Sequence, residues 1–163
     1  MKLNEVIAKY GNQEVDESKI KEVLGVKESK VWKPKDDERF YVVAGYGLIL
    51  SGTSSSMDFL EAYLDVGNCY KTLEEAEFAR DKQIFLTKFE RYLRENEDEP
   101  VDYSNQQQNK YYITFIHSHK KICVDVWMRI QTQGSILTTS EEVLEQFIKD
   151  NESDIKKYMF GVE

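Results

Sequence analysis

A ten-residue pattern occurs twice in this chain, and it constrains the fold more than any other feature. The copies lie at residues 67–76 and 134–143 and align without a gap. Both read Gly, small polar, apolar, apolar, any residue, Thr, any residue, Glu, Glu, apolar. Both follow a segment rich in aromatic residues. Internal similarity of this kind indicates a duplicated structural unit.

The polar half of the pattern has the spacing of a helix N-terminal cap. Thr72 and Glu75 form a capping box, in which the threonine hydroxyl accepts from a first-turn amide and the glutamate accepts from the cap amide. Thr139 and Glu142 repeat that spacing. Carboxylates here also favour the positive end of the helix dipole. We therefore interpret the paired glutamates as capping groups and not as an acid–base pair.

The hydrophobic periodicity predicts strands before each copy and a helix after it. Apolar residues alternate before each copy, as in half-buried strands. They then recur at helical spacing, as Phe85 and Phe89 do. The predicted elements are strands over 40–43, 46–50, 110–116 and 121–130, helices over 73–96, 140–149 and 154–158, a Gly/Ser/Thr loop over 51–56, and a segment over 59–66 that fits either a strand or a helical turn.

These elements predict an α+β fold. It consists of a duplicated unit of antiparallel β-hairpin or sheet followed by a helix, with a short helical N-terminal appendage. We expect the appendage and connector at 1–30, the first unit at 31–99, and the second at 100–163, packed with the first as one domain. A chain of 163 residues can bury a core without disulfides or metal.

The charge balance bears on possible partners. The formal net charge is −8, and the only local basic cluster covers residues 119–121. A field of that sign repels a phosphate backbone, so we expect no direct nucleic-acid binding. A basic surface on another protein would be attracted. Because no apolar run approaches 18 residues and the N-terminus has no apolar signal region, we expect no membrane association and a cytoplasmic location.

Candidate catalytic residues are few. His117 and His119 fall at a predicted hairpin turn with no acidic or cysteine ligand beside them. Cys69 and Cys123 lie in apolar segments, as buried reduced thiols do. A Cys–His nucleophilic pair is the remaining catalytic alternative. The sequence predicts no enzyme, no metal site and no cofactor.

Two sets of residues are candidates for binding. An acidic run could imitate nucleic acid toward a basic site on a partner protein. It comprises Glu95, Glu97, Asp98, Glu99 and Asp102.

Aromatic residues on the hairpins provide the alternative, since they could stack on a small nucleotide whose charge nearby cations would meet. The residues in question are Tyr46, Tyr112, Trp127 and Arg129, with Arg39 and Lys110 as further cations.

The chain resembles a large family of uncharacterised phage and prophage proteins of Firmicutes. The residues that carry the resemblance are Trp32-Lys33-Pro34, the strand at 40–43, the motif at 67–77 and the closing segment at 155–162. Family members often have an arginine shortly before the Gly-Asn pair, where this chain has residues 63–66 without one. The resemblance implies a dispensable phage gene, of the sort that blocks a host defence or redirects a host protein.

The resemblance, the acidic charge and the lack of catalytic motifs together lead to one functional expectation. We expect a non-enzymatic phage accessory protein in the host cytoplasm, which inhibits a host protein by stoichiometric binding. The alternative is a small-molecule binder that sequesters a signalling nucleotide.

Overall fold

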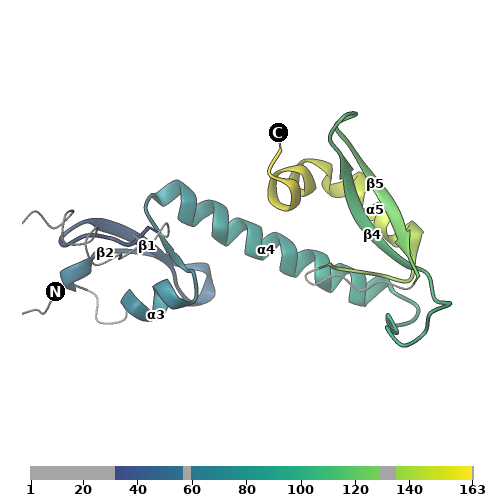
Figure 1. Cartoon of the computed structure of the whole chain (residues 1–163), viewed down its shortest axis with the longest axis horizontal. Helices are drawn as coiled ribbons and strands as arrows, with labels where there is room; N and C mark the ends of the chain where they lie inside the picture. Colours follow the sequence, from purple (N-terminus) through teal and green to yellow (C-terminus); the bar gives the residue numbers. More distant parts are fainter. Residues whose placement is uncertain (1–31, 57–59, 129–134, 163) are drawn as a thin grey trace, which may run out of the picture.

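In the residues that the structure describes, two small antiparallel sheets lie at opposite ends of one long helix (Figure 1). The structure, a computed structural model, describes residues 32–56, 60–128 and 135–162. Its helices and antiparallel sheets confirm the predicted α+β class. The helical appendage predicted over 1–30 lies outside the described residues.

The first sheet has β1 (Arg39–Val43) at its centre. β2 (Ile49–Thr53) and β3 (Cys69–Tyr70) pair with its two edges, both antiparallel. Phe40 and Val42 are fully buried because β1 packs against the long helix α4 (Leu73–Asn96). The first unit is thus a sheet laid on the N-terminal part of α4.

The turn between β1 and β2 differs from its prediction. The strand expected over 46–50 begins only at Ile49, and Tyr46 lies in the turn η1 (Gly45–Gly47). Tyr46 and Gly47 have φ angles of 63° and 72°. Positive φ at two consecutive residues is typical of a type I′ turn, whose twist matches that of paired strands. The connection from β2 to β3 consists of η2 (Ser54–Ser56) and the helix α3 (Leu60–Asp65).

The second sheet repeats the topology of the first. β4 (Lys110–Ile116) and β5 (Lys121–Trp127) form the predicted hairpin. The second strand, predicted over 121–130, ends at Trp127, and residues 129 and 130 lie outside the described residues. Thr138 then returns to β4 and makes an antiparallel bridge to Tyr111, with N–H···O distances of 2.8 and 3.0 Å. In both units, therefore, a segment after the hairpin pairs with the first hairpin strand and leads into a capped helix.

The two helix caps do not fall at equivalent positions of the repeated sequence. The capping box of α4 is confirmed, because Thr72 Oγ1 accepts from the Glu75 amide at 3.2 Å and the Glu75 carboxylate accepts from the Thr72 amide. The box predicted at Thr139 and Glu142 is wrong: Ser140 caps α5 (Glu141–Asp154) and accepts from the Val143 amide.

A shift in strand pairing explains the shifted cap. In each unit the cap lies two residues after the last residue paired with the hairpin, at Tyr70 and Thr72 in the first and at Thr138 and Ser140 in the second. Thr139 is therefore displaced from the cap, and its hydroxyl donates instead to the Glu99 carbonyl at 2.9 Å.

An aromatic cluster joins the second unit to α4. Phe147 of α5 is fully buried and lies 4.5 Å from Phe89, 5.0 Å from Tyr92 and 5.9 Å from Phe85 between ring centroids. Aromatic side chains at such separations combine large apolar burial with favourable ring contacts. The same core includes Ile113 and Ile122 of the hairpin, Leu93 of α4, and Leu144 and Ile155.

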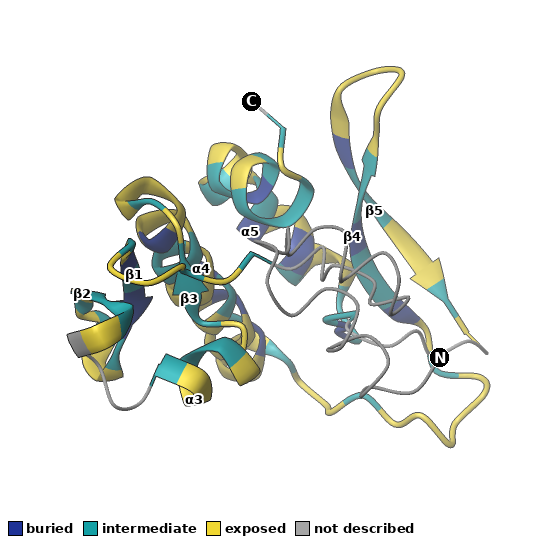
Figure 2. Cartoon of the chain, turned by 60° about the vertical axis from the view of Figure 1, so that its left-hand side comes forward, coloured by how far each residue is buried: buried dark blue, intermediate teal, exposed yellow. Residues whose placement is uncertain are grey.

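The C-terminal segment folds back on this core after a kink. Asn151 departs from helical geometry, and its side-chain amide donates to the Phe147 carbonyl at 2.9 Å. A short π-helix, η3 (Ile155–Phe160), follows and ends at Gly161, whose φ is 63°. Figure 2 shows buried positions on α5 and the hairpin, and an exposed loop between α4 and β4.

Replacing the central aromatic residue should destabilise the fold strongly. We expect Phe147→Ala to lower the free energy of unfolding by about 3–5 kcal/mol, because it removes a buried ring and leaves a cavity. Phe78→Ala is the matched control, because Phe78 is 40% exposed. This substitution should lower the free energy of unfolding by about 1 kcal/mol or less. Urea unfolding measures both, and equal losses would contradict the central role of Phe147.

The position of the second cap can be tested with two neighbouring variants. Ser140→Ala should lower the free energy of unfolding by about 1 kcal/mol, because the first turn of α5 loses its side-chain acceptor. Thr139→Ala keeps that cap and removes only the bond to Glu99. If urea unfolding shows no loss of stability with Ser140→Ala, the cap at Ser140 is contradicted.

Candidate functional site

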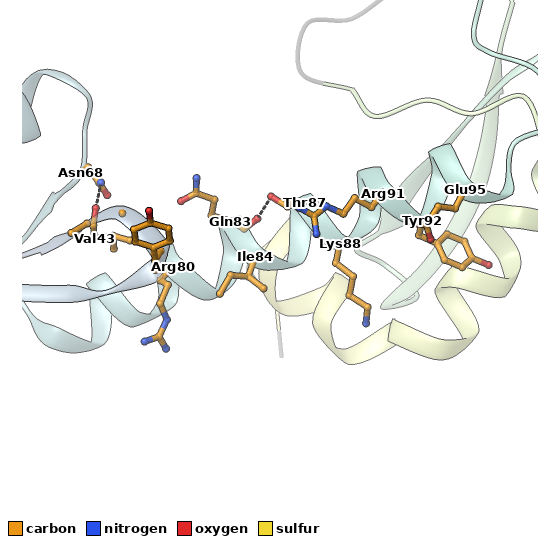
Figure 3. Close-up of a pocket in the computed structure, with 14 residues that line it drawn as sticks. Val43, Asn68, Arg80, Gln83, Ile84, Thr87, Lys88, Arg91, Tyr92 and Glu95 are labelled. Carbon is orange, nitrogen blue, oxygen red and sulfur yellow. Dashed lines mark hydrogen bonds between the residues drawn. The ribbon is translucent and has the colours of Figure 1, made fainter.

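A groove of about 870 Å³ runs along one face of α4, from the β1–β2 turn to Glu95. The α4 residues that line it include Arg80, Ile84, Lys88, Arg91 and Glu95, which Figure 3 shows in a row along the helix. Their spacing of three or four residues places them on one helical face.

The fold leaves this face of α4 uncovered. Phe85, Phe89 and Leu93 point to the opposite side of the helix and are buried in the aromatic core. The groove face leaves Ile84 58% exposed. One side of α4 therefore supports the fold, and the other is available for contact.

The cations of the groove differ in how far their charges are neutralised. Arg80 forms an ion pair with Asp81 at 2.8 Å. The Lys88 ammonium donates to the neutral side-chain oxygen of Asn151 at 2.7 Å, which orients the lysine without cancelling its charge. Arg91 has no ion pair or side-chain hydrogen bond to any residue that the structure describes. Positive charge thus concentrates at Lys88 and Arg91.

Tyr46 stands at the edge of the groove in an unfavourable backbone conformation. Its side chain is fully exposed and its φ is 63°. A bulky side chain at positive φ costs about 1 kcal/mol or more, and the first central position of such a turn ordinarily holds Asn, Asp or Gly. The turn geometry explains the positive φ but not the choice of tyrosine.

The predicted acidic run divides into three environments. Glu95 lines the groove, whereas Glu97 ends α4 and has one buried carboxylate oxygen without a hydrogen-bond partner among the described residues. Asp98, Glu99 and Asp102 are exposed on the loop that follows. The structure therefore spreads these carboxylates over a helix end and a loop, and Glu97 faces inward in part.

The loop that carries the run is held by side-chain hydrogen bonds. Gln108 donates to the Pro100 carbonyl at 3.2 Å and accepts from the Asp102 amide at 2.7 Å. Lys110 is only 2% exposed, and its ammonium donates to the carbonyls of Asn105 and Gln108 at 2.8 and 3.1 Å. Lys110 is thus committed to the loop, and its expected role toward a nucleotide is wrong.

Asp102 has a local structural role in the same loop. Its carboxylate accepts from the hydroxyl and the amide of Ser104 at 2.6 and 2.8 Å. These hydrogen bonds, the hydroxyl one first, lower the pKa of Asp102 from its ordinary value of 3.8. The carboxylate therefore stays ionised at neutral pH and is partly occupied within its own turn.

The four aromatic and basic residues proposed for a nucleotide do not form one site. Tyr112 and Trp127 lie together on the second sheet, with ring centroids 4.2 Å apart, but Tyr46 lies in the β1–β2 turn of the first unit. Arg129 lies outside the described residues. The Tyr112 hydroxyl donates to Asp125 at 3.1 Å, and burial, followed by this carboxylate, raises the pKa of Tyr112. A carboxylate at this position would repel a phosphate group.

The groove face of α4 escaped the sequence analysis, although its signal was present. Arg80, Ile84, Lys88 and Arg91 recur at helical spacing on the face opposite Phe85 and Phe89. Ile84, an apolar residue among cations on the polar side of the predicted helix, was the sequence signal for this face.

Within residues 32–56, 60–128 and 135–162, no three His, Cys, Asp or Glu side chains gather as metal ligands would. Nor does any helix of these ranges have the length and apolar character needed to cross a membrane.

Comparison with protein-family models, curated proteins and solved structures found no match.

The strain at Tyr46 predicts a stabilising substitution. Tyr46→Asn should raise the free energy of unfolding by about 0.5–1 kcal/mol, because asparagine tolerates positive φ better than tyrosine does. Tyr103→Asn is the matched control, since Tyr103 is half exposed and does not have a positive φ. Urea unfolding in which Tyr46→Asn is neutral or destabilising would show that the tyrosine contributes to the fold.

Proposed function

We propose that this protein acts by stoichiometric binding of a partner protein, and that the groove face of α4 is its contact surface. The observation that carries the proposal is the exposure of Tyr46, Ile84 and Arg91 along one groove. Tyr and Arg are the residues most enriched where binding energy concentrates in protein interfaces. A partly apolar centre with charges around it is also the usual anatomy of such interfaces.

The rigidity of the surface supports the same proposal. α4 is held by a capping box at its start and by the aromatic core along its opposite face. The groove side chains are therefore presented on an element that the rest of the fold keeps in place. Surfaces arranged in advance lose less conformational freedom on binding, and this raises affinity.

The resemblance described above supports a proposal for the class of partner. A phage accessory protein meets host proteins, so we propose a host protein, such as a defence component, as the partner that is inhibited. In this proposal the protein works by occupying a surface of its partner and has no catalytic step of its own. Its place of action would be the host cytoplasm.

The acidic run offers a second contact surface for the same function. Asp98 and Glu99 are exposed, and neither forms an ion pair with a Lys or Arg of the described residues. The loop that carries them is anchored by Lys110 and by the bond from Thr139 to Glu99. A basic patch on the partner could meet this loop while α4 occupies an adjoining surface.

The proposed contact can be tested by recovering the partner and weighing the complex. The tagged protein is incubated with a lysate of a Firmicutes host, and native mass spectrometry measures what remains bound. We expect a protein in stoichiometric amount, and we expect Ile84→Asp to abolish its recovery because the substitution places a charge at the apolar centre of the groove. Val66→Asp is the control, since Val66 is 74% exposed and lies outside the groove.

Other outcomes of the same experiment separate the alternatives. Loss of the partner with Asp98→Asn and Glu99→Gln combined, but not with Ile84→Asp, would assign contact to the acidic loop, because neither of these two carboxylates lines the groove. A bound mass of a few hundred daltons in place of a protein would favour the nucleotide-sequestering alternative. Unchanged recovery with every variant would contradict both proposed surfaces.

A further inference from the structure

The geometry points to an acidic protein segment with an apolar side chain as the occupant of the α4 groove. This inference rests on the proposed function and adds the chemistry of the partner. It combines the uncancelled charges of Lys88 and Arg91, the exposed Ile84 between them and Arg80, and the exposed ring of Tyr46.

The groove carries positive charge that no carboxylate of the described residues neutralises. The protein as a whole has a net charge of −8, yet Lys88 and Arg91 lie one helical turn apart on the same face without a carboxylate partner among the described residues. Glu95 follows one turn later and marks the acidic end of the groove. An anionic group near Arg91 would meet its guanidinium, which can hold a carboxylate through two parallel hydrogen bonds.

The apolar side chains beside these charges exclude an occupant that is anionic throughout. Ile84 lies one turn before Lys88 and is 58% exposed. Burial of Ile84 stabilises a complex only if the occupant has an apolar group that packs against it. Tyr46 stands at the end of the groove nearest Arg80, where its ring could cover such a group.

The number of cations favours a protein segment over nucleic acid. Nucleic-acid binding ordinarily neutralises many phosphates along a strand, and the net charge of −8 opposes a long polyanion. A short segment needs only one or two carboxylates near Lys88 and Arg91. At physiological salt the Debye length is about 8 Å, so the acidic charges elsewhere on the protein are largely screened from so short a segment.

The strained conformation of Tyr46 is an independent indication of contact. The turn would be more stable with asparagine, and the tyrosine ring has no packing role because it is fully exposed. Strained backbone positions cluster at ligand-contacting sites. A stabilising substitution that removes binding would therefore show what the tyrosine contributes.

The experiment uses two synthetic probes and the full chain. The acidic probe is the peptide Glu-Leu-Glu-Glu-Leu-Phe-Glu-Glu, and the basic probe replaces each Glu by Lys. In NMR titrations we expect the acidic probe to shift the backbone amides of Ile84, Lys88 and Arg91, and the basic probe to leave them unchanged. We also expect the affinity for the acidic probe to fall as salt is raised.

Two charge-reversal variants provide the matched comparison. Arg91→Glu should lower the affinity for the acidic probe by roughly tenfold to a hundredfold, the range expected for losing a charged hydrogen bond. Arg94→Glu changes the net charge equally, but Arg94 lies outside the groove and is 76% exposed, so its effect should be less than about threefold. Tyr46→Asn should weaken binding while the protein remains at least as stable.

The outcomes distinguish this inference from the proposed function. If the acidic probe does not shift the groove amides, or Arg91→Glu and Arg94→Glu act equally, the inference is overturned. The proposed function would still stand if the recovered partner depends on Ile84. Shifts of the same amides by a single-stranded oligonucleotide, and not by the peptide, would overturn the inference in favour of a nucleic-acid ligand.

Discussion

The structure depends above all on the packing of Phe147 against the aromatic face of α4. Its ring contacts Phe85, Phe89 and Tyr92, and this contact fixes α5 and the second hairpin to the C-terminal half of the long helix. Because a helix has a limited circumference, turning these aromatic residues inward turns Arg80, Ile84, Lys88 and Arg91 outward. The core and the groove are thus two consequences of one helical register.

The same packing links the C-terminal segment to the groove. The kink at Asn151 follows Phe147 by one turn, and it brings the asparagine oxygen to the ammonium of Lys88. At the other end, the β1–β2 turn presents Tyr46 above the start of the groove face. The β1–β2 turn and α4 therefore form the groove within the first unit, and the second unit contributes the Asn151 oxygen that orients Lys88.

The duplicated pattern shows how far sequence similarity predicts structure. The topology of hairpin, returning segment and capped helix is repeated in both units, as the pattern predicted. The cap moved by one residue in the second copy because Thr138 pairs with Tyr111, which leaves Ser140 at the helix start. Serine and threonine are both good caps, so the sequence permitted either register and strand pairing selected one.

The sequence by itself determined the fold class, the bounds of α4 and its first cap, the β4–β5 hairpin and the inward face of the long helix. These features follow from local periodicity and capping chemistry, which adjacent residues carry. Only the tertiary structure decided that Lys110 is buried within the loop, that Tyr46 lies apart from Tyr112 and Trp127, and that the polar face of α4 becomes a groove. The physical reason is that exposure and proximity depend on which elements pack against each other, and distant residues such as Phe147 set that packing.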